Sequence, residues 1–206
     1  MPDFSIELSR RGVIVGVDEA GRGPWAGPVV AGAAILNPDT LPDDLVASLD
    51  DSKKLKAEKR EALLARLQDT DAILGVGIAT AQEIDDINIL QATMRAMGRA
   101  VDNLGIIPDF ALIDGNRVPE GLPCAAQAVV KGDGKSLSIA AASIVAKVTR
   151  DRMMAELDRT YPGYGWTANA GYGTKAHQEG LNTLGVTPEH RKSFAPIRKI
   201  LSPGDS

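Results

Sequence analysis

Short apolar runs that end at acidic or turn-forming residues characterise the first 36 positions. Residues 13–17 form a β-branched run that stops at Asp18 and Glu19, and residues 28–36 form a second run rich in Ala and Gly. Both runs predict strands. The intervening segment 20–27 contains three glycines and a proline, which permit a tight turn with exposed backbone. We therefore expect a hairpin at the start of the chain.

The middle of the chain alternates between helical and strand patterns. Leucines share one face of residues 56–68, and this periodicity predicts a helix. After Asn88, which can act as an N-cap, apolar side chains recur at helical spacing as far as Leu104, just before Gly105. Compact strand patterns occupy residues 72–79, 110–113 and 125–130, and the last two stop near acids.

The C-terminal third is predicted to be helical. Residues 138–160 form a long helical pattern, in which three consecutive alanines allow close packing against a sheet. Thr187 and Pro188 have the N-cap and first-turn chemistry of a last helix. Strands followed by alternating helices and strands indicate an α/β domain built on a mixed sheet. We expect residues 1–160 to form this domain and residues 161–206 a helical extension packed on it as one structural unit.

The composition is that of an ordinary soluble globular protein. The chain has 206 residues, 44% hydrophobic and 24% charged, and no apolar run approaches the roughly 20 residues that cross a bilayer. The N-terminus lacks the pattern of a secretory signal, so we expect a cytoplasmic protein without a membrane segment. The single cysteine, Cys124, has neither a disulfide partner nor metal-ligand spacing, which favours a small buried hydrophobe.

The net charge of −4 argues against a nucleic-acid binder if it is considered alone. The distribution of charge changes this picture, because basic side chains gather in three segments. These segments are 53–60, 131–152 and 191–199. Each could equally be a solvated face, so the charge pattern leaves both interpretations open.

Four carboxylates follow the ends of three predicted strands: Asp18, Glu19, Asp114 and Asp133. One acid at a strand end is usually a turn former, but four that converge in one sheet would repel one another unless cations neutralise them. Oxygen donors without His or Cys favour Mg²⁺ or Mn²⁺ over zinc. Two such ions about 3.5–4 Å apart can hydrolyse a phosphodiester. The only histidines, His177 and His190, are expected to make substrate or structural contacts rather than to act as a general base.

Six motifs occur in the order found in bacterial ribonuclease HII, and the chain resembles that family over roughly residues 13–200. The motifs are Asp18–Gly23, Asp51–Leu55, Ile113–Asn116, Lys131–Asp133, Ser138–Asp151 and Gly171–Thr174. The resemblance implies a ribonuclease H-like fold, with a mixed five-stranded sheet flanked by helices. It also implies that the four acids bind metal and catalyse, with two Mg²⁺ or Mn²⁺ ions in the active complex.

The resemblance further implies that Gly21, Arg22, Gly23 and Tyr172 recognise the sugar of the substrate. Physical chemistry agrees, since glycines let backbone N–H and C=O groups approach a 2′-hydroxyl group without an intervening Cβ. Tyr172 can stack on the following sugar. Four further residues are plausible phosphate contacts: Ser52, Lys53, Lys147 and Arg150. Lys147 is also spaced for an ion pair with Asp151, which remains an alternative.

The implied activity is endonucleolytic hydrolysis of the RNA strand of RNA/DNA hybrids. Cutting on the 5′ side of single ribonucleotides in duplex DNA, with 3′-hydroxyl and 5′-phosphate ends, would serve ribonucleotide removal in replication and repair. The alternatives are a ribonuclease H-fold nuclease acting on DNA alone and a hybrid-binding protein without catalysis. The tail from Leu201 to Ser206 has no aromatic-rich clamp-docking peptide, so no clamp partner is predicted, and a monomer is expected. Trp25 and Trp166 receive no role.

Overall fold

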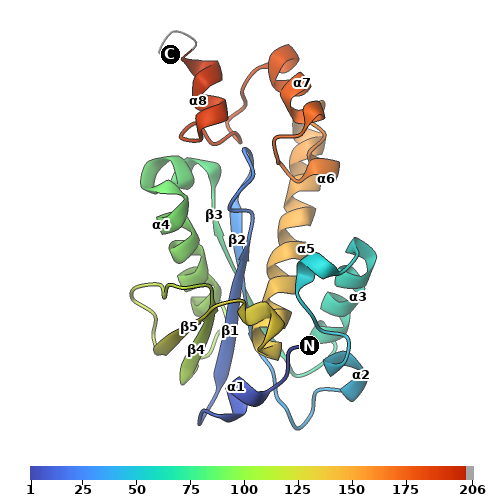
Figure 1. The fold of residues 1–206 in the computed structure, drawn as a ribbon, viewed down its shortest axis with the longest axis vertical. Coiled ribbons are helices and arrows are strands. Elements are labelled where there is room, and N and C mark those ends of the chain that lie inside the picture. Colours follow the sequence, from blue (N-terminus) through green and yellow to red (C-terminus); the bar gives the residue numbers. More distant parts are fainter. Residues whose placement is uncertain (203–206) are drawn as a thin grey trace.

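A five-stranded mixed sheet with strand order β3-β2-β1-β4-β5 forms the centre of the computed structural model, which describes residues 1–202 (Figure 1). Strand β1 pairs antiparallel with β2, as does β2 with β3, whereas β1 pairs parallel with β4 and β4 with β5. The strands are β1 (Ile14–Ala20), β2 (Val29–Ile35), β3 (Ile73–Ala79), β4 (Phe110–Asp114) and β5 (Ala125–Val129). The predicted hairpin and the predicted mixed sheet are therefore confirmed.

Two long helices cover opposite faces of this sheet: α4 (Ala81–Asp102) and α5 (Leu137–Thr160). Helix α3 (Ala57–Gln68) packs beside α5. Shorter helical elements complete the chain: α1 (Ser5–Leu8), α2 (Asp43–Val46), η1 (Ser52–Lys54), η2 (Gly132–Gly134), α6 (Trp166–Asn169), α7 (Lys175–Leu184) and α8 (Ala195–Leu201). Figure 1 shows α6, α7 and α8 gathered at the end of the molecule away from the N-terminus. Within residues 1–202, no helix has the length and apolar character to cross a membrane.

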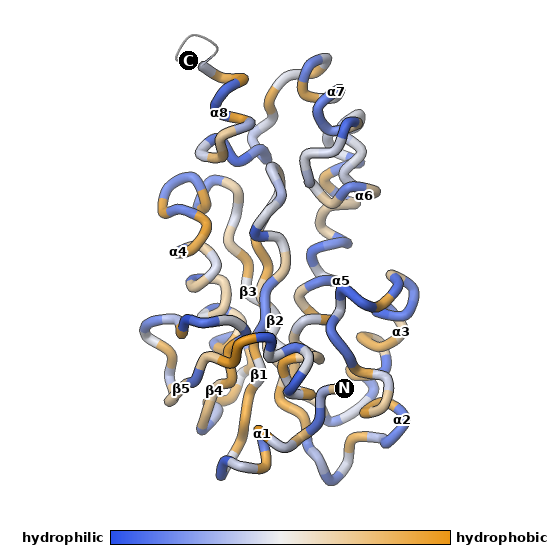
Figure 2. The backbone as a smooth tube through the Cα atoms, in the orientation of Figure 1, coloured by the Kyte–Doolittle hydropathy of each residue, from blue (hydrophilic) through white to orange (hydrophobic). Residues whose placement is uncertain are grey.

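The two faces of β1 carry different residue types because each packs against a different helix. Val15 and Val17 are fully buried in the cluster formed with α4, whereas a Cβ at Gly16 would overlap the backbone of α5. The same holds for Gly32 on β2, which approaches the Ala142 carbonyl group. Hydrophobic residues follow these central strands in Figure 2. The predicted close packing of the alanine-rich helix on the sheet is thus confirmed, and it depends on facing glycines.

We expect Gly32→Ala to destabilise the fold, because the added Cβ would lie 2.9 Å from Ala146 N and still closer to Ala142 O. Overpacking of this kind costs roughly 1–3 kcal/mol, which lowers the melting temperature of a domain this size by several degrees. Gly98→Ala is the matched control, since nothing lies within 4 Å of its Cβ position in α4. It should raise stability by roughly 0.5–1 kcal/mol. Thermal unfolding of both variants measures this, and equal melting temperatures would contradict the packing argument.

Helix α4 begins earlier than the sequence pattern predicts. Thr80, just before Ala81, forms a capping box with Glu83 in the first turn, and the helical element continues across Asn88, which has a φ of 68°. The Asn88 side chain accepts hydrogen bonds from Leu90 N (3.0 Å) and Gln91 N (3.1 Å). The predicted cap at Asn88 is therefore present, but it lies at a kink inside a longer element.

The prediction of a last helix starting at Thr187 is wrong. Helix α8 starts at Ala195, and residues 188–189 form a turn instead. The side chain of His190 is fully buried, and its Nδ1 accepts a hydrogen bond from Thr187 N (3.0 Å). This tertiary constraint prevails over the local Thr-Pro capping signal. Pro203 to Ser206, part of the tail considered for clamp docking, lie outside the described residues.

Candidate active site

The acids come together because their strands are neighbours. Val17 on β1 pairs with Ile113 on β4, so one residue further along these parallel strands Asp18 and Asp114 lie side by side. Asp133 follows in η2, whose Gly132 N–H donates to Asp114 Oδ1 (2.6 Å). Strand β1 continues through Glu19 to Ala20, so the first two acids lie near the end of the strand but still within it.

Burial and mutual repulsion raise the pKa values of three of these acids. Asp18 is 3% exposed, and burial, followed by the charges of Glu19 and Asp114, raises its pKa well above the usual range. Burial raises the pKa of Glu19, although Arg22 partly opposes the effect. Burial and then Asp114 raise the pKa of Asp133. The protein alone therefore leaves this concentration of negative charge incompletely neutralised.

Lys53 brings a positive charge to the same acids. Its Nζ lies 3.9 Å from Asp133 Oδ2, and although burial lowers its pKa, Asp18 and the nearby acids produce a net rise. Asp51 caps η1, where its side chain accepts a hydrogen bond from Lys53 N (2.9 Å), and its charge also raises the pKa of Asp133. Sequence reasoning did not assign Asp51 to the site, although it is the first residue of the Asp51–Leu55 motif.

The four acids fit a divalent cation in donor chemistry and in charge. All four offer hard carboxylate oxygens. Burial, followed by repulsion between neighbouring acids, raises the pKa values of Asp18, Glu19 and Asp133, and a bound cation would oppose both effects. Within residues 1–202, however, no three His, Cys, Asp or Glu side chains are arranged as a ready-made set of metal ligands. Binding an ion would therefore require side-chain adjustment among acids that are already neighbours.

A cleft of about 250 Å³ adjoins the acids and contains every residue predicted to bind substrate. Its walls come from the end of β1, from η1, from α5 and from the loop before α7. The lining residues are Glu19, Ala20, Gly21, Arg22, Gly23, Ser52, Lys53, Lys147, Arg150 and Tyr172. The fold thus joins motifs that are separated by more than 100 positions in the sequence.

The glycine turn is closely fitted to its surroundings at one position and open at another. Gly21 has a φ of 97°, and a Cβ there would overlap the guanidinium group of Arg150. A Cβ at Gly23 would lie 3.4 Å from the ring of Tyr172, which is an ordinary contact distance. Tyr172 is 51% exposed and faces this turn across the cleft.

The structure gives Arg150 a different environment from the one expected of a phosphate contact. Its side chain is buried and donates to the carbonyl groups of Pro28 (2.9 Å), Ala170 (2.9 Å) and Ala26 (3.2 Å). This burial argues against direct phosphate binding and in favour of a structural role beneath the turn. Lys147 forms the ion pair with Asp151 that the sequence analysis left open as an alternative.

Arg191 is a site residue that sequence reasoning missed. It is fully buried, and it donates to the carbonyl groups of Gly21, Arg22 and Gly27. Its own backbone N–H donates to Trp25 O (2.8 Å), so Trp25, which had no assigned role, helps to anchor it. No local pattern marks Arg191, because its partners lie about 165 positions earlier in the chain.

Both histidines and Trp166 form a buried cluster near the cleft. Trp166 Nε1 donates to His177 Nε2 (3.1 Å), which lies 3.0 Å from His190 Nε2. His177 Nδ1 lies 2.9 Å from the carbonyl oxygen of Tyr172. This burial agrees with structural contacts, one of the two roles expected of the histidines in place of a general base.

We expect the stability contributed by the two buried histidines to fall as the pH drops from about 6.5 toward 4. Burial and the neighbouring His177 lower the pKa of His190 to about 4, and burial lowers the pKa of His177. The unfolded chain, with His pKa values near 6.5, therefore binds more protons in this window, and the loss approaches ~3 kcal/mol. Thermal unfolding between pH 7 and 4 measures it. His190→Gln should flatten the dependence, and an unchanged slope in that variant would contradict the assignment.

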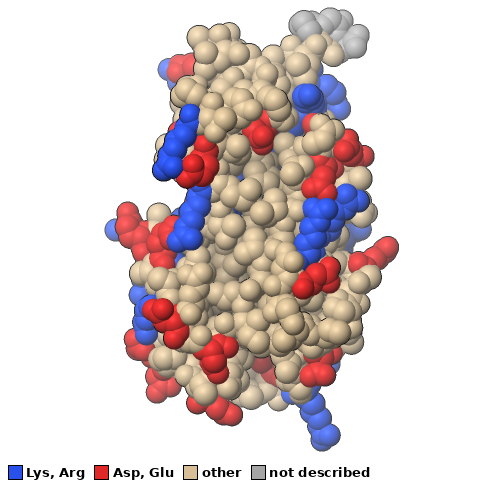
Figure 3. Space-filling view, turned by 180° about the vertical axis from the view of Figure 1, so that it is seen from behind, with Lys and Arg blue, Asp and Glu red and all other residues tan. Residues whose placement is uncertain are grey.

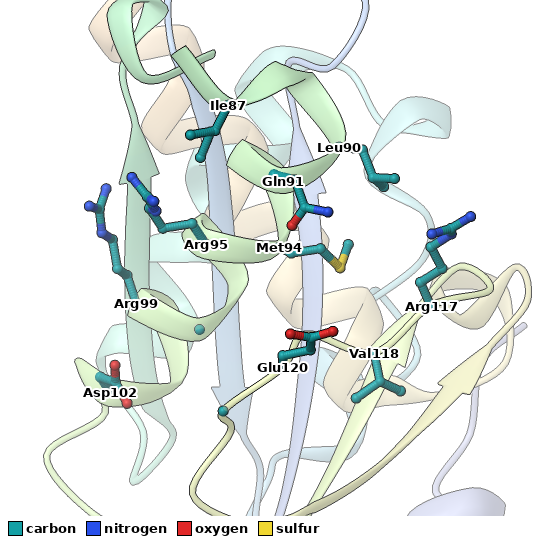
Figure 4. A pocket seen from close by; sticks show the side chains of 12 residues that line it. Ile87, Leu90, Gln91, Met94, Arg95, Arg99, Asp102, Arg117, Val118 and Glu120 are labelled. Atoms are coloured by element: carbon teal, nitrogen blue, oxygen red, sulfur yellow. The ribbon is translucent and has the colours of Figure 1, made fainter. Parts of the chain in front are cut away.

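Further depressions extend from the acids along α4. One cavity of about 290 Å³ shares Glu19 and Arg22 with the cleft and is also lined by Asp114 and Arg117. Another, of about 540 Å³, shares Leu90, Met94 and Arg117 with the first. Figure 4 shows the second cavity between α4 and the loop that follows β4. The cleft and these two cavities therefore form a continuous groove that passes the acids.

Within residues 1–202, ion pairs with acids involve some basic side chains of the first two segments but none of segment 191–199. Arg60 and Lys147 pair with Asp151, and Arg152 pairs with Glu61. In the face shown in Figure 3, Lys and Arg side chains alternate with Asp and Glu along both flanks. No broad basic surface is seen on that face.

Neighbouring carboxylates at the ends of β1 and β4, on a mixed sheet of this strand order, define a metal-dependent nuclease of the ribonuclease H class. The family model described as Ribonuclease HII matches residues 15–197. The chain belongs to the ribonuclease HII family, whose divalent-metal-dependent members cleave the RNA of RNA/DNA hybrids and act in ribonucleotide removal.

Individual relatives agree with this membership. The Ribonuclease HII of Paramagnetospirillum magneticum is 58% identical over 98% of this chain and 99% of its own length. The crystal structure of the ribonuclease H2 from Pyrococcus horikoshii OT3 is 32% identical, with a TM-score of 0.75 over 91% of this chain and 96% of that one. A structure of the PCNA:RNase HII complex from Archaeoglobus fulgidus is 25% identical, with a TM-score of 0.73 over 88% and 95%.

Proposed function

We propose that this ribonuclease cuts on the 5′ side of a ribonucleotide, including a single ribonucleotide in duplex DNA, and leaves 3′-hydroxyl and 5′-phosphate ends. The observation that carries the proposal is the position of Glu19. This acid lines the cleft that contains the glycine turn and Tyr172, and it also lines the neighbouring cavity that contains Asp114. A sugar bound against the turn would therefore place its phosphodiester next to the acids.

Asp18, Glu19, Asp114 and Asp133 are proposed to hold Mg²⁺ or Mn²⁺, with two ions in the active complex. Bound ions of this kind activate a water molecule and stabilise the leaving oxygen. The chain contributes ligands fixed by β1, β4 and η2, and the hydrogen bond from Gly132 N to Asp114 Oδ1 orients one of them. The Lys53 ammonium group, close to Asp133, would limit repulsion while the ions are absent.

The turn at Gly21–Gly23 and Tyr172 are proposed to recognise the sugar. Backbone groups can serve a 2′-hydroxyl as both donor and acceptor, and the half-exposed Tyr172 ring offers a stacking surface. Ser52, Lys53 and Lys147 line the same cleft and are proposed to contact phosphates, for which Lys147 would have to leave Asp151. For Arg150, burial supports positioning of the turn instead.

Two other activities remain to be separated from this one by experiment. A nuclease that acts on DNA alone would have no use for a glycine turn facing Tyr172, and this juxtaposition weighs against it. A hybrid-binding protein without catalysis would have no need to bury Asp18 beside Glu19 and Asp114, an arrangement that raises the pKa of Asp18 and so disfavours its ionised form.

The test uses three end-labelled duplexes of one sequence: an RNA/DNA hybrid, a DNA duplex with one ribonucleotide, and an all-DNA duplex. We expect cleavage of the first two in Mg²⁺ or Mn²⁺, no cleavage in EDTA, and no cleavage of the third. Fragment mobility and a phosphatase-sensitive end locate the cut. Cleavage of the all-DNA duplex would favour the general DNA nuclease, and intact strands with either metal would favour the binding protein.

A further inference from the structure

The carbonyl groups of the glycine turn are held by a residue from the far end of the chain. Arg191 Nη1 donates to Arg22 O (2.9 Å), Nη2 donates to Gly21 O, and Nε donates to Gly27 O (2.9 Å). A guanidinium group presents its donors in a rigid planar fork, so these carbonyl groups are fixed relative to one another. The backbone of the turn is therefore oriented by Arg191 rather than by its own local hydrogen bonds.

The N–H groups of the same turn are left available to a ligand. Within residues 1–202, the backbone N–H groups of Gly21, Arg22 and Gly23 donate no hydrogen bond to another group of the protein. All three residues are at least partly exposed to the cleft. With its carbonyl groups fixed from below, the turn presents free donors at a defined orientation, as recognition of a hydroxyl or phosphate oxygen requires.

The opposite wall, the Tyr172 loop, is held by His177. The Tyr172 carbonyl oxygen lies 2.9 Å from His177 Nδ1, and Trp166 Nε1 donates to His177 Nε2. Because indole N–H can only donate, Nε2 of His177 must accept, and the proton of the neutral ring lies on Nδ1. His177 therefore donates to the Tyr172 backbone.

His190 connects this histidine to Arg191. Its Nδ1 accepts from Thr187 N (3.0 Å), so the neutral ring carries its proton on Nε2 and donates to His177 Nε2. Each ring nitrogen of the pair thus has a partner when both rings are neutral. Burial, which lowers both histidine pKa values, favours this neutral state. The bonded path runs from Tyr172 through His177 and His190 to the next residue, Arg191.

We propose that Arg191 and His177 are positioning residues for ribonucleotide recognition, each of which orients one wall of the cleft. Arg191 fixes the Gly21–Gly23 turn, and His177 fixes the Tyr172 loop. This inference rests on the proposed function of the turn and of Tyr172 in sugar recognition. Neither positioning residue touches the substrate, so each acts through the group that it holds.

The test measures binding of fluorescent duplexes by anisotropy in an Asp18→Asn background, where the strand stays uncut. The measured quantity is the ratio of Kd for an all-DNA duplex to Kd for the duplex with one ribonucleotide. His177→Leu removes the donor to Tyr172 O and should lower this ratio about tenfold. His177→Asn places an amide N–H near the Nδ1 position and should retain most of the ratio. Both variants lose the contacts to Trp166 and His190. The difference between their Kd ratios therefore reports the effect of the hydrogen bond to Tyr172 O alone.

Arg191→Lys retains the charge but not the fork, and it should also lower the ratio about tenfold. Arg66→Lys, at a surface ion pair with Asp44, is the control that should leave the ratio unchanged. In a Tyr172→Ala background, His177→Leu should have no further effect on the ratio, because its influence passes through Tyr172. A merely structural role would instead give additive losses. Melting temperatures show which variants fold, and if Arg191→Lys does not, the His177 pair decides.

The proposal is overturned if folded His177→Leu keeps the parental ratio, if His177→Asn loses as much as His177→Leu, or if the losses with Tyr172→Ala are additive. If Arg191→Lys folds and keeps the parental Kd ratio, Arg191 has no positioning role. A parental protein that does not distinguish the two duplexes would refute sugar recognition itself, and so the proposed function. Discrimination by the parental protein together with unaffected variants would refute only the positioning roles.

Discussion

Asp18→Asn is expected to abolish cleavage while leaving the fold intact. Asparagine keeps the shape of the side chain but removes the charge at the point where β1 and β4 bring the acids together. Loss of a metal ligand of this kind costs about 4 kcal/mol of transition-state stabilisation, or roughly a thousandfold in rate. Single-turnover cleavage of the duplex with one ribonucleotide measures the effect.

The same substitution, although it lowers activity, is expected to leave the stability of the metal-free protein unchanged or to raise it. Burial and the charges of Glu19 and Asp114 raise the pKa of Asp18, so its ionised form is unfavourable in the folded, metal-free protein at neutral pH. The melting temperature of the variant in EDTA should therefore equal or exceed that of the parent. Asp71→Asn, at an exposed acid bonded to Thr40, is the matched control and should cleave normally. Near-normal turnover of Asp18→Asn would remove Asp18 from catalysis.

Gly21→Ala is expected to reduce both the cleavage rate and the preference for a ribonucleotide. The new Cβ would occupy the position of the buried Arg150 guanidinium group, and the φ of 97° is unfavourable for alanine. The turn must shift, and a displacement near 1 Å at a reactive site costs roughly a hundredfold in rate. Rates on the hybrid and on the one-ribonucleotide duplex, with affinity for the all-DNA duplex, measure both effects.

Gly105→Ala controls for backbone strain, because Gly105 also has a positive φ, of 75°, but nothing lies within 4 Å of its Cβ position. It should lower stability without changing cleavage. Equal losses of activity in the two variants would mean that general strain, and not the position of the turn, explains the result for Gly21.

The sheet and the long helices could be predicted because their signals are local. Each strand is a compact apolar run, and α5 requires only helical spacing with small residues against Gly16 and Gly32. The short helices α1, α2 and α6 span four residues each and carry no periodicity that a sequence reader could use. The start of α8 was misplaced because burial of His190 outweighs a local capping signal.

Part of the candidate site could likewise be predicted from the sequence, and part could not. The acids and the glycine turn lie in recognisable motifs, so their proximity at one end of the sheet could be anticipated. Sequence alone could not show that Arg150 is buried, nor that Arg191 holds carbonyl groups some 170 positions away. Such roles arise from tertiary hydrogen bonds, which leave no periodic trace. The catalytic assignments themselves remain predictions for the experiments above.

Two buried arginines beneath the glycine turn also bear on how an acidic protein attracts a polyanion. The pKa of Arg150 is lowered to about 10 and that of Arg191 to about 9, mainly by burial, so both remain cationic at neutral pH. Their hydrogen bonds go to backbone carbonyl groups, which leaves the positive charge uncancelled under the cleft floor. Dissolved ions screen exposed charges much more than buried ones. Electrostatic attraction of a nucleic acid to this cleft should therefore persist at ionic strengths that would screen the charges of a lysine-rich surface.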